Sequence, residues 1–130
     1  MSIFDQLQDI FLVSLGAVLG VNIRFIIYKK FEKLNFSKDS SILIINTFSC
    51  LLLGFFISIL PRMSSYDFSN KLLLFYYIGF LGSLSTFSTF VYDLFNFFLQ
   101  LKFSRALKLF FSSLSLGLIA LVLGFFIGNQ

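Results

Sequence analysis

The sequence contains no histidine and no tryptophan, and it has a single cysteine and a single proline. Without histidine, and with Cys50 as the one thiol, there is no Cys/His set for zinc or haem and no pair for an internal disulfide. The usual nucleophile–base pairs of catalysis, which most often use histidine, are missing as well. These absences argue against an enzyme and against a zinc or haem protein.

Charged residues are also scarce. They make up 12% of the 130 residues, while 58% are hydrophobic; ordinary soluble domains are about 25% charged. A chain this small forms one domain, residues 1–130, and cannot bury so much apolar surface in water. Phenylalanine supplies 21 residues, a number that codon bias in an AT-rich genome explains as well as function does. The composition predicts a membrane protein whose solvent is the lipid bilayer, with no nucleic-acid partner.

Four segments are long enough to cross a bilayer, which takes about 20 mostly apolar residues. The second of them is expected to stop at Pro61, since proline cannot continue a helix. The first nine residues carry Asp5 and Asp9 but no basic residue, so the first apolar run is predicted to be a retained helix rather than a signal peptide. The predicted spans are residues 10–28, 41–60, 71–99 and 109–127, joined by polar loops at 29–40, 62–70 and 100–108.

Basic residues are concentrated on one side of the predicted membrane topology. The first and third loops share one side, and both termini share the other side with the second loop. Seven Lys or Arg residues fall on the first side and two on the second, with Arg24 left out because it lies within a span. The positive-inside rule therefore predicts cytoplasmic first and third loops and external termini. The seven are Lys29, Lys30, Lys33, Lys38, Lys102, Arg105 and Lys108, and the two are Arg62 and Lys71.

The third span is expected to be broken. Residues 79–90 read GFLGSLSTFSTF, with two glycines and five Ser or Thr residues. Non-helical backbone at membrane depth is tolerated only where it is buried in protein or lines a cavity. We expect a break near residues 82–86; the alternative is a continuous helix that uses its small residues for close packing.

Local patterns in all four spans coincide with those of one family. The patterns are GAVLGVNIR at 16–24, NTFS at 46–49 followed by Gly54, the stretch 79–90 followed by Asp93, and Ser113 followed by Gly117 and Gly124. In this order they resemble the Fluc (CrcB) family of fluoride channels over essentially the whole chain. The stretch 79–90 is the most specific, being similar to the family signature Gly-Phe-x-Gly-Gly-Leu-Thr-Thr-Phe-Ser-Thr-Phe. The sequence departs from the family at Ser49, Ser83 and Ser85.

The resemblance implies an all-α membrane protein of four transmembrane helices with a broken third helix. Two such subunits would pair as an antiparallel, dual-topology dimer with two fluoride pores and a central structural Na⁺. The carbonyls of Gly82 and Ser85 would hold the Na⁺. A fourth-helix aromatic would be Phe110 or Phe111, or the position is lost. The implied pore-lining residues are Asn46, Phe87, Ser88, Thr89, Phe90 and Ser113.

These residue types suit a small, strongly hydrated anion. Hydroxyl and amide groups donate hydrogen bonds, and the edges of phenyl rings carry partial positive charge. The alternative for Phe87 and Phe90 is ordinary helix packing at i, i+3 spacing. Arg24 either attracts anions near a pore mouth or snorkels to the interface near Lys29. Asp93, where the family usually has Glu, either caps or orients pore groups, or pairs with a basic residue of the partner.

The charge bias has a consequence for assembly. A chain that inserts in one orientation cannot form an antiparallel homodimer, so we hypothesise a heterodimer with a homologous subunit of opposite bias. The resemblance implies passive export of fluoride across a bacterial inner membrane. The alternatives are a small proton-coupled multidrug exporter, disfavoured because Asp93 is the one acid within a predicted span, and a non-conducting partner subunit.

Overall fold

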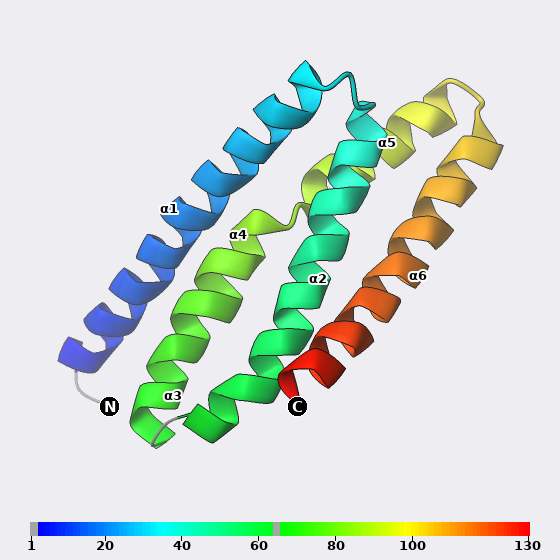
Figure 1. Cartoon of the computed structure of the whole chain (residues 1–130). Coiled ribbons are helices and arrows are strands. Elements are labelled where there is room, and N and C mark those ends of the chain that lie inside the picture. Colours follow the sequence, from blue (N-terminus) through cyan, green and yellow to red (C-terminus); the bar gives the residue numbers. More distant parts are fainter. Residues whose placement is uncertain (1–2, 64–65) are drawn as a thin grey trace.

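The structure is a computed structural model that describes residues 3–63 and 66–130, and within these ranges it contains helices and no strand (Figure 1). Four stretches are long and apolar enough to cross a membrane, which confirms the predicted all-α, four-span architecture. The elements are α1 (Ile3–Lys33), α2 (Lys38–Met63), α3 (Tyr66–Leu73), η1 (Leu74–Leu81), α4 (Gly82–Leu84), α5 (Phe87–Leu99) and α6 (Phe103–Gly128).

The helices extend beyond the apolar runs from which the spans were predicted. α6 begins at Phe103, so Arg105 and Lys108 lie in its first turns rather than in a loop, and α2 continues through Pro61. The physical reason is that hydrocarbon thickness limits a span, whereas helical hydrogen bonding continues through the polar interface. Residues 64–65 of the expected second loop lie outside the described residues.

The ends of the helices fall into two groups (Figure 1). The start of α1, the end of α2 and the end of α6 lie at one end of the molecule. The turns at 34–37 and 100–102 lie at the other. This arrangement places the predicted basic side of the topology at a single end of the helices.

Glycines allow two close helix contacts. α1 packs on η1 and α4, and α2 packs on α6. A Cβ at Gly20 of α1 would collide with the Ser83 hydroxyl and the Phe80 carbonyl oxygen. In the second contact, a Cβ at Gly54 or Gly124 would collide with backbone of the facing helix. Close backbone approach at small residues is the usual way in which helices associate within a membrane.

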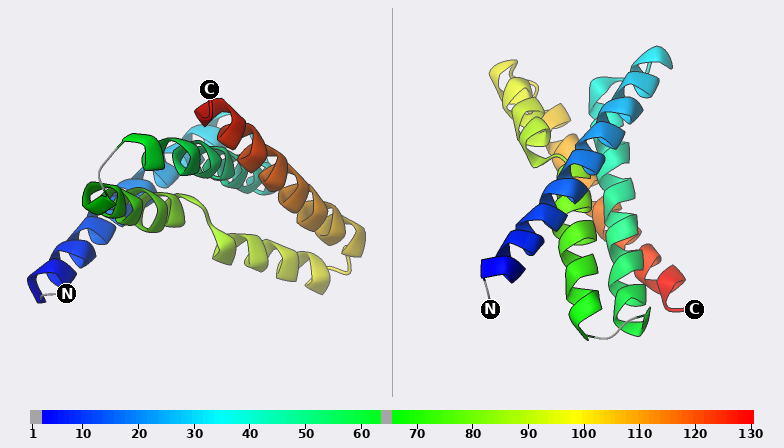
Figure 2. Two further views of the ribbon diagram at one scale, coloured as in Figure 1. Left: turned by 90° about the horizontal axis from the view of Figure 1, so that it is seen from below. Right: turned by 90° about the vertical axis from the view of Figure 1, so that its left-hand side faces the viewer.

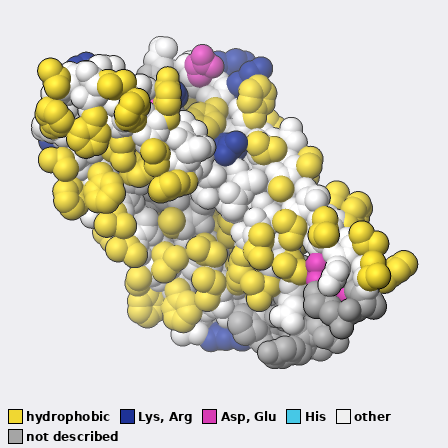
Figure 3. All heavy atoms as spheres, turned by 180° about the vertical axis from the view of Figure 1, so that it is seen from behind, with side chains coloured by type: hydrophobic (Ala, Val, Ile, Leu, Met, Phe, Trp, Pro, Cys, Tyr) yellow, Lys and Arg dark blue, Asp and Glu magenta, His cyan; other side chains and the backbone are white. Residues whose placement is uncertain are grey.

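Most large apolar side chains face outward rather than into a core. Ile42 and Leu84 are the largest fully buried side chains among the described residues. Apolar side chains cover much of the surface in Figure 3, with basic groups near its upper and lower margins and also farther in on the upper part of this face. Such an exterior suits lipid or another apolar helix, in agreement with a membrane location.

Candidate functional site

The third span is interrupted at Ser85 and Thr86, within the predicted interval. Ser85 has ψ 155° and Thr86 has φ −137° and ψ 104°, so both have extended backbone between α4 and α5. Figure 2 shows the chain shifting sideways at this point before the next helix begins. The prediction of a broken helix is confirmed, and the alternative of a continuous helix is wrong.

The helix leading to the break is wider than an α-helix. Residues Leu74–Leu81 form π-helical turns, and the Gly82 amide at their end donates to the carbonyls of Tyr77 and Gly79. Gly79 also meets α1 closely, since a Cβ there would lie 2.6 Å from the Val13 carbonyl oxygen. π-Helical turns within helices are frequent at functional sites. This π-helical segment was not predicted from the sequence, because the periodicity of eight consecutive residues does not distinguish a π-helix from an α-helix.

The side chain of Asn46 holds the break from α2. The Thr86 amide donates to Asn46 Oδ1 at 2.9 Å, and Asn46 Nδ2 donates to the Thr86 carbonyl at 3.4 Å. One side chain thus satisfies both backbone groups of a residue that is only 4% exposed. In a continuous helix that amide would donate to the Gly82 carbonyl instead. The amide group of Asn46 has a second donor hydrogen, so its predicted pore-lining role stays a prediction beside this structural one.

Thr86 also caps the helix that follows the break. Its hydroxyl oxygen accepts from the Thr89 amide at 3.3 Å and lies 2.7 Å from the Thr89 hydroxyl oxygen, to which it donates. A side-chain oxygen at this position satisfies one of the free amides in the first turn of a helix. Thr86 therefore marks the start of α5 and fixes the Thr89 hydroxyl.

Replacing Thr86 with valine is expected to lower the free energy of unfolding by about 1 kcal/mol, because the isosteric side chain cannot accept from the Thr89 amide. Thermal unfolding in detergent measures the effect. Thr86→Ser keeps the hydroxyl and serves as the matched control, with stability near that of the wild-type protein. Equal losses in both variants would contradict the capping role.

Arg24 reaches the break from α1. Its Nη1 lies 3.5 Å from the Ser85 carbonyl oxygen, and the residue is half-buried. The two roles that the sequence suggested for Arg24, attracting anions near a pore mouth and snorkelling to the interface near Lys29, stay predictions beside this contact. A guanidinium at this depth places fixed positive charge beside the break.

The aromatic residues expected to line a pore gather between α5 and α6. Phe87 and Phe90 have ring centroids 6.3 Å apart, and Phe90 and Phe110 stack with centroids 6.5 Å apart. Together with Ser113 they line a hollow of about 320 Å³. Phe87 is 78% exposed, so its ring is not held by helix packing within this chain. Of the two fourth-helix candidates, the structure places Phe110 in this hollow.

The predicted pore residues do not all share this hollow. Ser88 lies on another side of α5, where it lines a shallow hollow together with Phe87 and Tyr92. Phe87 borders both hollows and so connects them. Thr89 is half-buried and bonded to Thr86. The exposed hydroxyl of Ser88 therefore needs a second subunit if it is to join a closed pathway.

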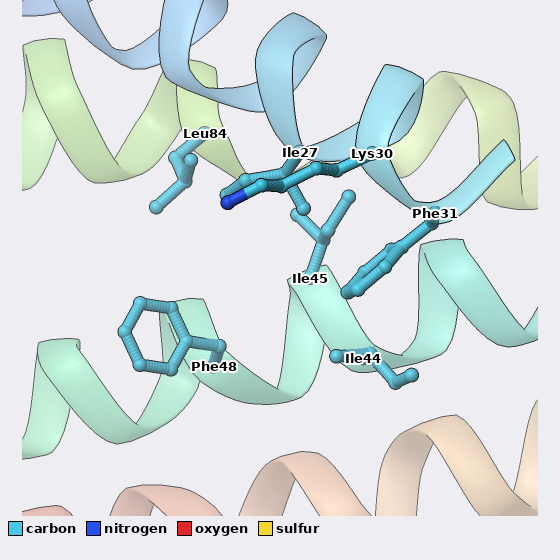
Figure 4. A pocket seen from close by; sticks show the side chains of 7 residues that line it. All are labelled: Ile27, Lys30, Phe31, Ile44, Ile45, Phe48 and Leu84. Atoms are coloured by element: carbon cyan, nitrogen blue, oxygen red, sulfur yellow. The ribbon is translucent and has the colours of Figure 1, made fainter. Parts of the chain in front are cut away.

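A further groove between α1 and α2 has a different chemistry. Figure 4 shows its lining, which is apolar except for the ammonium group of Lys30. Its volume is about 300 Å³. A groove without hydroxyl or amide donors offers little to replace the hydration of a small anion, which distinguishes it from the hollow beside Phe90. The other lining residues are Ile27, Phe31, Ile44, Ile45, Phe48 and Leu84.

The backbone at the break also fits a small cation in one respect. Because the Thr86 amide donates its hydrogen bond to Asn46, the Gly82 carbonyl lacks the donor that a continuous helix would supply. Gly82 is exposed on the surface of the subunit. The Ser85 carbonyl is within reach of Arg24, but a carbonyl oxygen has two lone pairs and can accept twice.

Asp93 is buried on α5 and pairs within its own chain. It is 6% exposed, and its Oδ1 lies 3.6 Å from Lys38 Nζ at the start of α2. From the sequence, Lys38 was predicted only as a loop charge, whereas it is the first residue of α2. Nothing in the local sequence links the two residues, because the tertiary contact between α2 and α5 brings them together.

Comparison with known proteins places these features in context. A family model described as "CrcB-like protein, Camphor Resistance (CrcB)" matches residues 11–125. The chain is 53% identical to "Fluoride-specific ion channel FluC 2" of Prochlorococcus marinus, over 95% of this chain and 100% of that protein. It is 31% identical to "Fluoride-specific ion channel FluC" of Desulfotalea psychrophila, over 97% and 96% of the two chains. It is 30% identical to a "FluC 1" from another Prochlorococcus marinus strain, over 91% and 90%.

Proposed function

Because the chain belongs to the CrcB-like family, we propose that it is a subunit of a fluoride-specific ion channel. The observation that carries the proposal is the broken third span, around which phenyl edges, hydroxyls and the Asn46 amide are gathered. Its activity is passive, so fluoride leaves the cytoplasm with the membrane potential and no reaction is catalysed. The named relatives are ion channels, not enzymes.

The chemistry of the site suits fluoride in two ways. The ion must exchange its water for donors, and the hydroxyls of Ser88 and Ser113 and the second hydrogen of the Asn46 amide supply them. The edges of Phe87 and Phe90 add weak electrostatic stabilisation at several points. Several weak sites in series also let the ion leave, as conduction requires.

Fluoride efflux from liposomes tests this function. The purified complex, reconstituted with internal potassium fluoride, is expected to release fluoride when valinomycin dissipates the potential, as read by a fluoride electrode. Liposomes loaded with potassium chloride instead should release no chloride, as read by a chloride electrode. Absence of fluoride release from the wild-type complex would overturn the proposed function.

We base the proposed assembly on the exposed side chains of the subunit and on the uneven distribution of its basic residues. The subunit pairs in antiparallel orientation with a homologous chain, since the exposed Phe87 ring and the separated hydroxyls need a second wall. The seven-to-two bias of basic residues favours a partner of opposite orientation over a second copy. Relatives whose names carry the numbers 1 and 2 are consistent with two related subunits. In this arrangement the turns at 34–37 and 100–102 are cytoplasmic.

Expression of this chain alone and with candidate paralogues tests the heterodimer. Fluoride resistance is expected only in the combination, and cysteines placed in the turn at 34–37 should be labelled from one side of the membrane. Resistance from this chain alone, with labelling from both sides, would reject the heterodimer while leaving the channel function intact.

A structural Na⁺ at the dimer centre is proposed on the carbonyls of Gly82 and Ser85, together with their counterparts in the partner. When bound, it would satisfy carbonyls that the break leaves without helical donors. Asn46 fixes the backbone that presents these carbonyls.

A proton-coupled multidrug exporter is a weaker reading. Such a protein needs a membrane-embedded carboxylate that is free to exchange protons for cations. Asp93 is instead paired with Lys38. A non-conducting partner subunit remains the other alternative, and liposome efflux of fluoride separates it from the proposed channel.

A further inference from the structure

The exposed Lys38 and the buried Asp93 form an ion pair. Lys38 lies at the start of α2, directly after the turn at 34–37. The Asp93 side chain is 7% exposed and that of Lys38 is 61% exposed, so the ammonium covers the carboxylate from the solvent side. Lys38 Nζ also lies 5.3 Å from the centroid of the Tyr92 ring. The lysine is thus held between a carboxylate and an aromatic face on the same helix.

The position of Asp93 puts its charge close to one of the two phenyl rings. Asp93 follows Phe90 by three residues, and residues with this spacing are neighbours on the surface of an α-helix. Three residues correspond to about 4.5 Å along the helix axis. An anion that passes the Phe90 ring therefore comes close to a buried carboxylate.

That carboxylate is only partly satisfied by protein groups. Asp93 Oδ2 is buried and has no hydrogen-bond partner among the described residues, and the same holds for the hydroxyl of Tyr28. Asp39, in the first turn of α2, adds a second carboxylate near Lys38. The ammonium of Lys38 is thus paired with Asp93 in a locally acidic region.

We propose that Lys38 is a positioning residue for conduction, which neutralises Asp93 so that fluoride can pass from the solvent to the stripe of Phe87 and Phe90. This inference rests on the proposed channel function. Without the ammonium, the carboxylate would repel the anion where the low-dielectric walls strengthen the repulsion. Asp93 in turn holds the lysine side chain at the start of α2, where a free lysine would extend into solvent.

A double-mutant cycle tests the proposal in reconstituted complex. Lys38→Met is expected to lower the initial rate of fluoride efflux by roughly tenfold or more, in line with the effect of charge on the approach of an ion. In the Asp93→Asn background the same substitution should change the rate by less than about twofold, since no carboxylate remains to be neutralised. Lys33→Met is the matched control, because Lys33 is exposed near the same end while Asp93 forms its ion pair with Lys38.

Chemical rescue separates charge from structure. In a Cys50→Ala background, Lys38→Cys should recover efflux after reaction with a positively charged aminoethyl thiosulfonate, and not after reaction with its neutral methyl counterpart. The proposal would be overturned if Lys38→Met conducted fluoride as well as wild type. It would also be overturned if Lys38→Met lost as much efflux in the Asp93→Asn background as in the wild-type background, or if the neutral reagent restored efflux. Failure of the wild-type complex to conduct would instead overturn the channel function.

Discussion

Replacing Asn46 with leucine is expected to reduce fluoride efflux by at least about tenfold and to lower the free energy of unfolding by about 1–3 kcal/mol. Leucine has a similar shape but cannot pair with the amide and carbonyl of Thr86. Thr86 is buried at membrane depth, where water does not replace the lost partner. The amide and carbonyl of Thr86 would then find hydrogen-bond partners within a continuous helix. Closing the break in this way would turn α5, with its phenyl rings, away from the pathway.

The measurements are efflux from liposomes and thermal unfolding in detergent. Asn22→Leu is the matched control, since Asn22 is exposed on α1 and its side chain only donates to the Val18 carbonyl of its own helix. The control should retain both efflux and stability. If Asn46→Leu matched it in both measurements, Asn46 would not be holding the break.

Gly124→Ala is expected to lower the free energy of unfolding by about 1–3 kcal/mol through overpacking between α2 and α6. A Cβ at this position would collide with the Leu51 carbonyl oxygen and lie 3.0 Å from the Phe55 amide nitrogen. Both contacts are backbone atoms of α2, which cannot rotate out of the way as a side chain can. The two helices would have to separate along their length, and each partner would lose close contacts.

Gly117→Ala, seven residues earlier on the same helix, is the matched control. Its Cβ would lie 3.4 Å from the Cys50 sulfur, an ordinary contact with a side chain. Unfolding in a graded denaturing detergent should place Gly117→Ala close to wild type and Gly124→Ala well below it. A similar stability for the two alanine variants would mean that the α2–α6 contact is looser than the structure indicates.

The sequence predicted the elements of the fold well because they depend on local composition. Apolar run length gave four spans, and the density of Gly, Ser and Thr in residues 79–90 gave the break in the third. Helix ends were predicted less well. Arg105 and Lys108 were assigned to a loop because they are charged, although charge ends a span and not a helix.

Residue-level roles at the site were only partly predictable. The hollow between α5 and α6 contains Phe87, Phe90 and Ser113, as the motif order suggested. The choice of Phe110 over Phe111 depends on the rotation of α6, which neighbouring phenylalanines in a sequence do not reveal. The pore-lining roles themselves stay predictions, since they require a second subunit.

By itself the sequence determined that this is a four-span membrane chain with a weak point in its third helix, because hydrophobicity and backbone propensity act locally along the chain. Only the tertiary structure decided which groups occupy that weak point: Asn46 on Thr86, Arg24 on Ser85, and Lys38 on Asp93. Each of these pairs joins residues from separate membrane spans. Which residues meet is set by helix packing at the glycine contacts. The distance and relative rotation of two packed helices depend on both helices and cannot be read from either one alone.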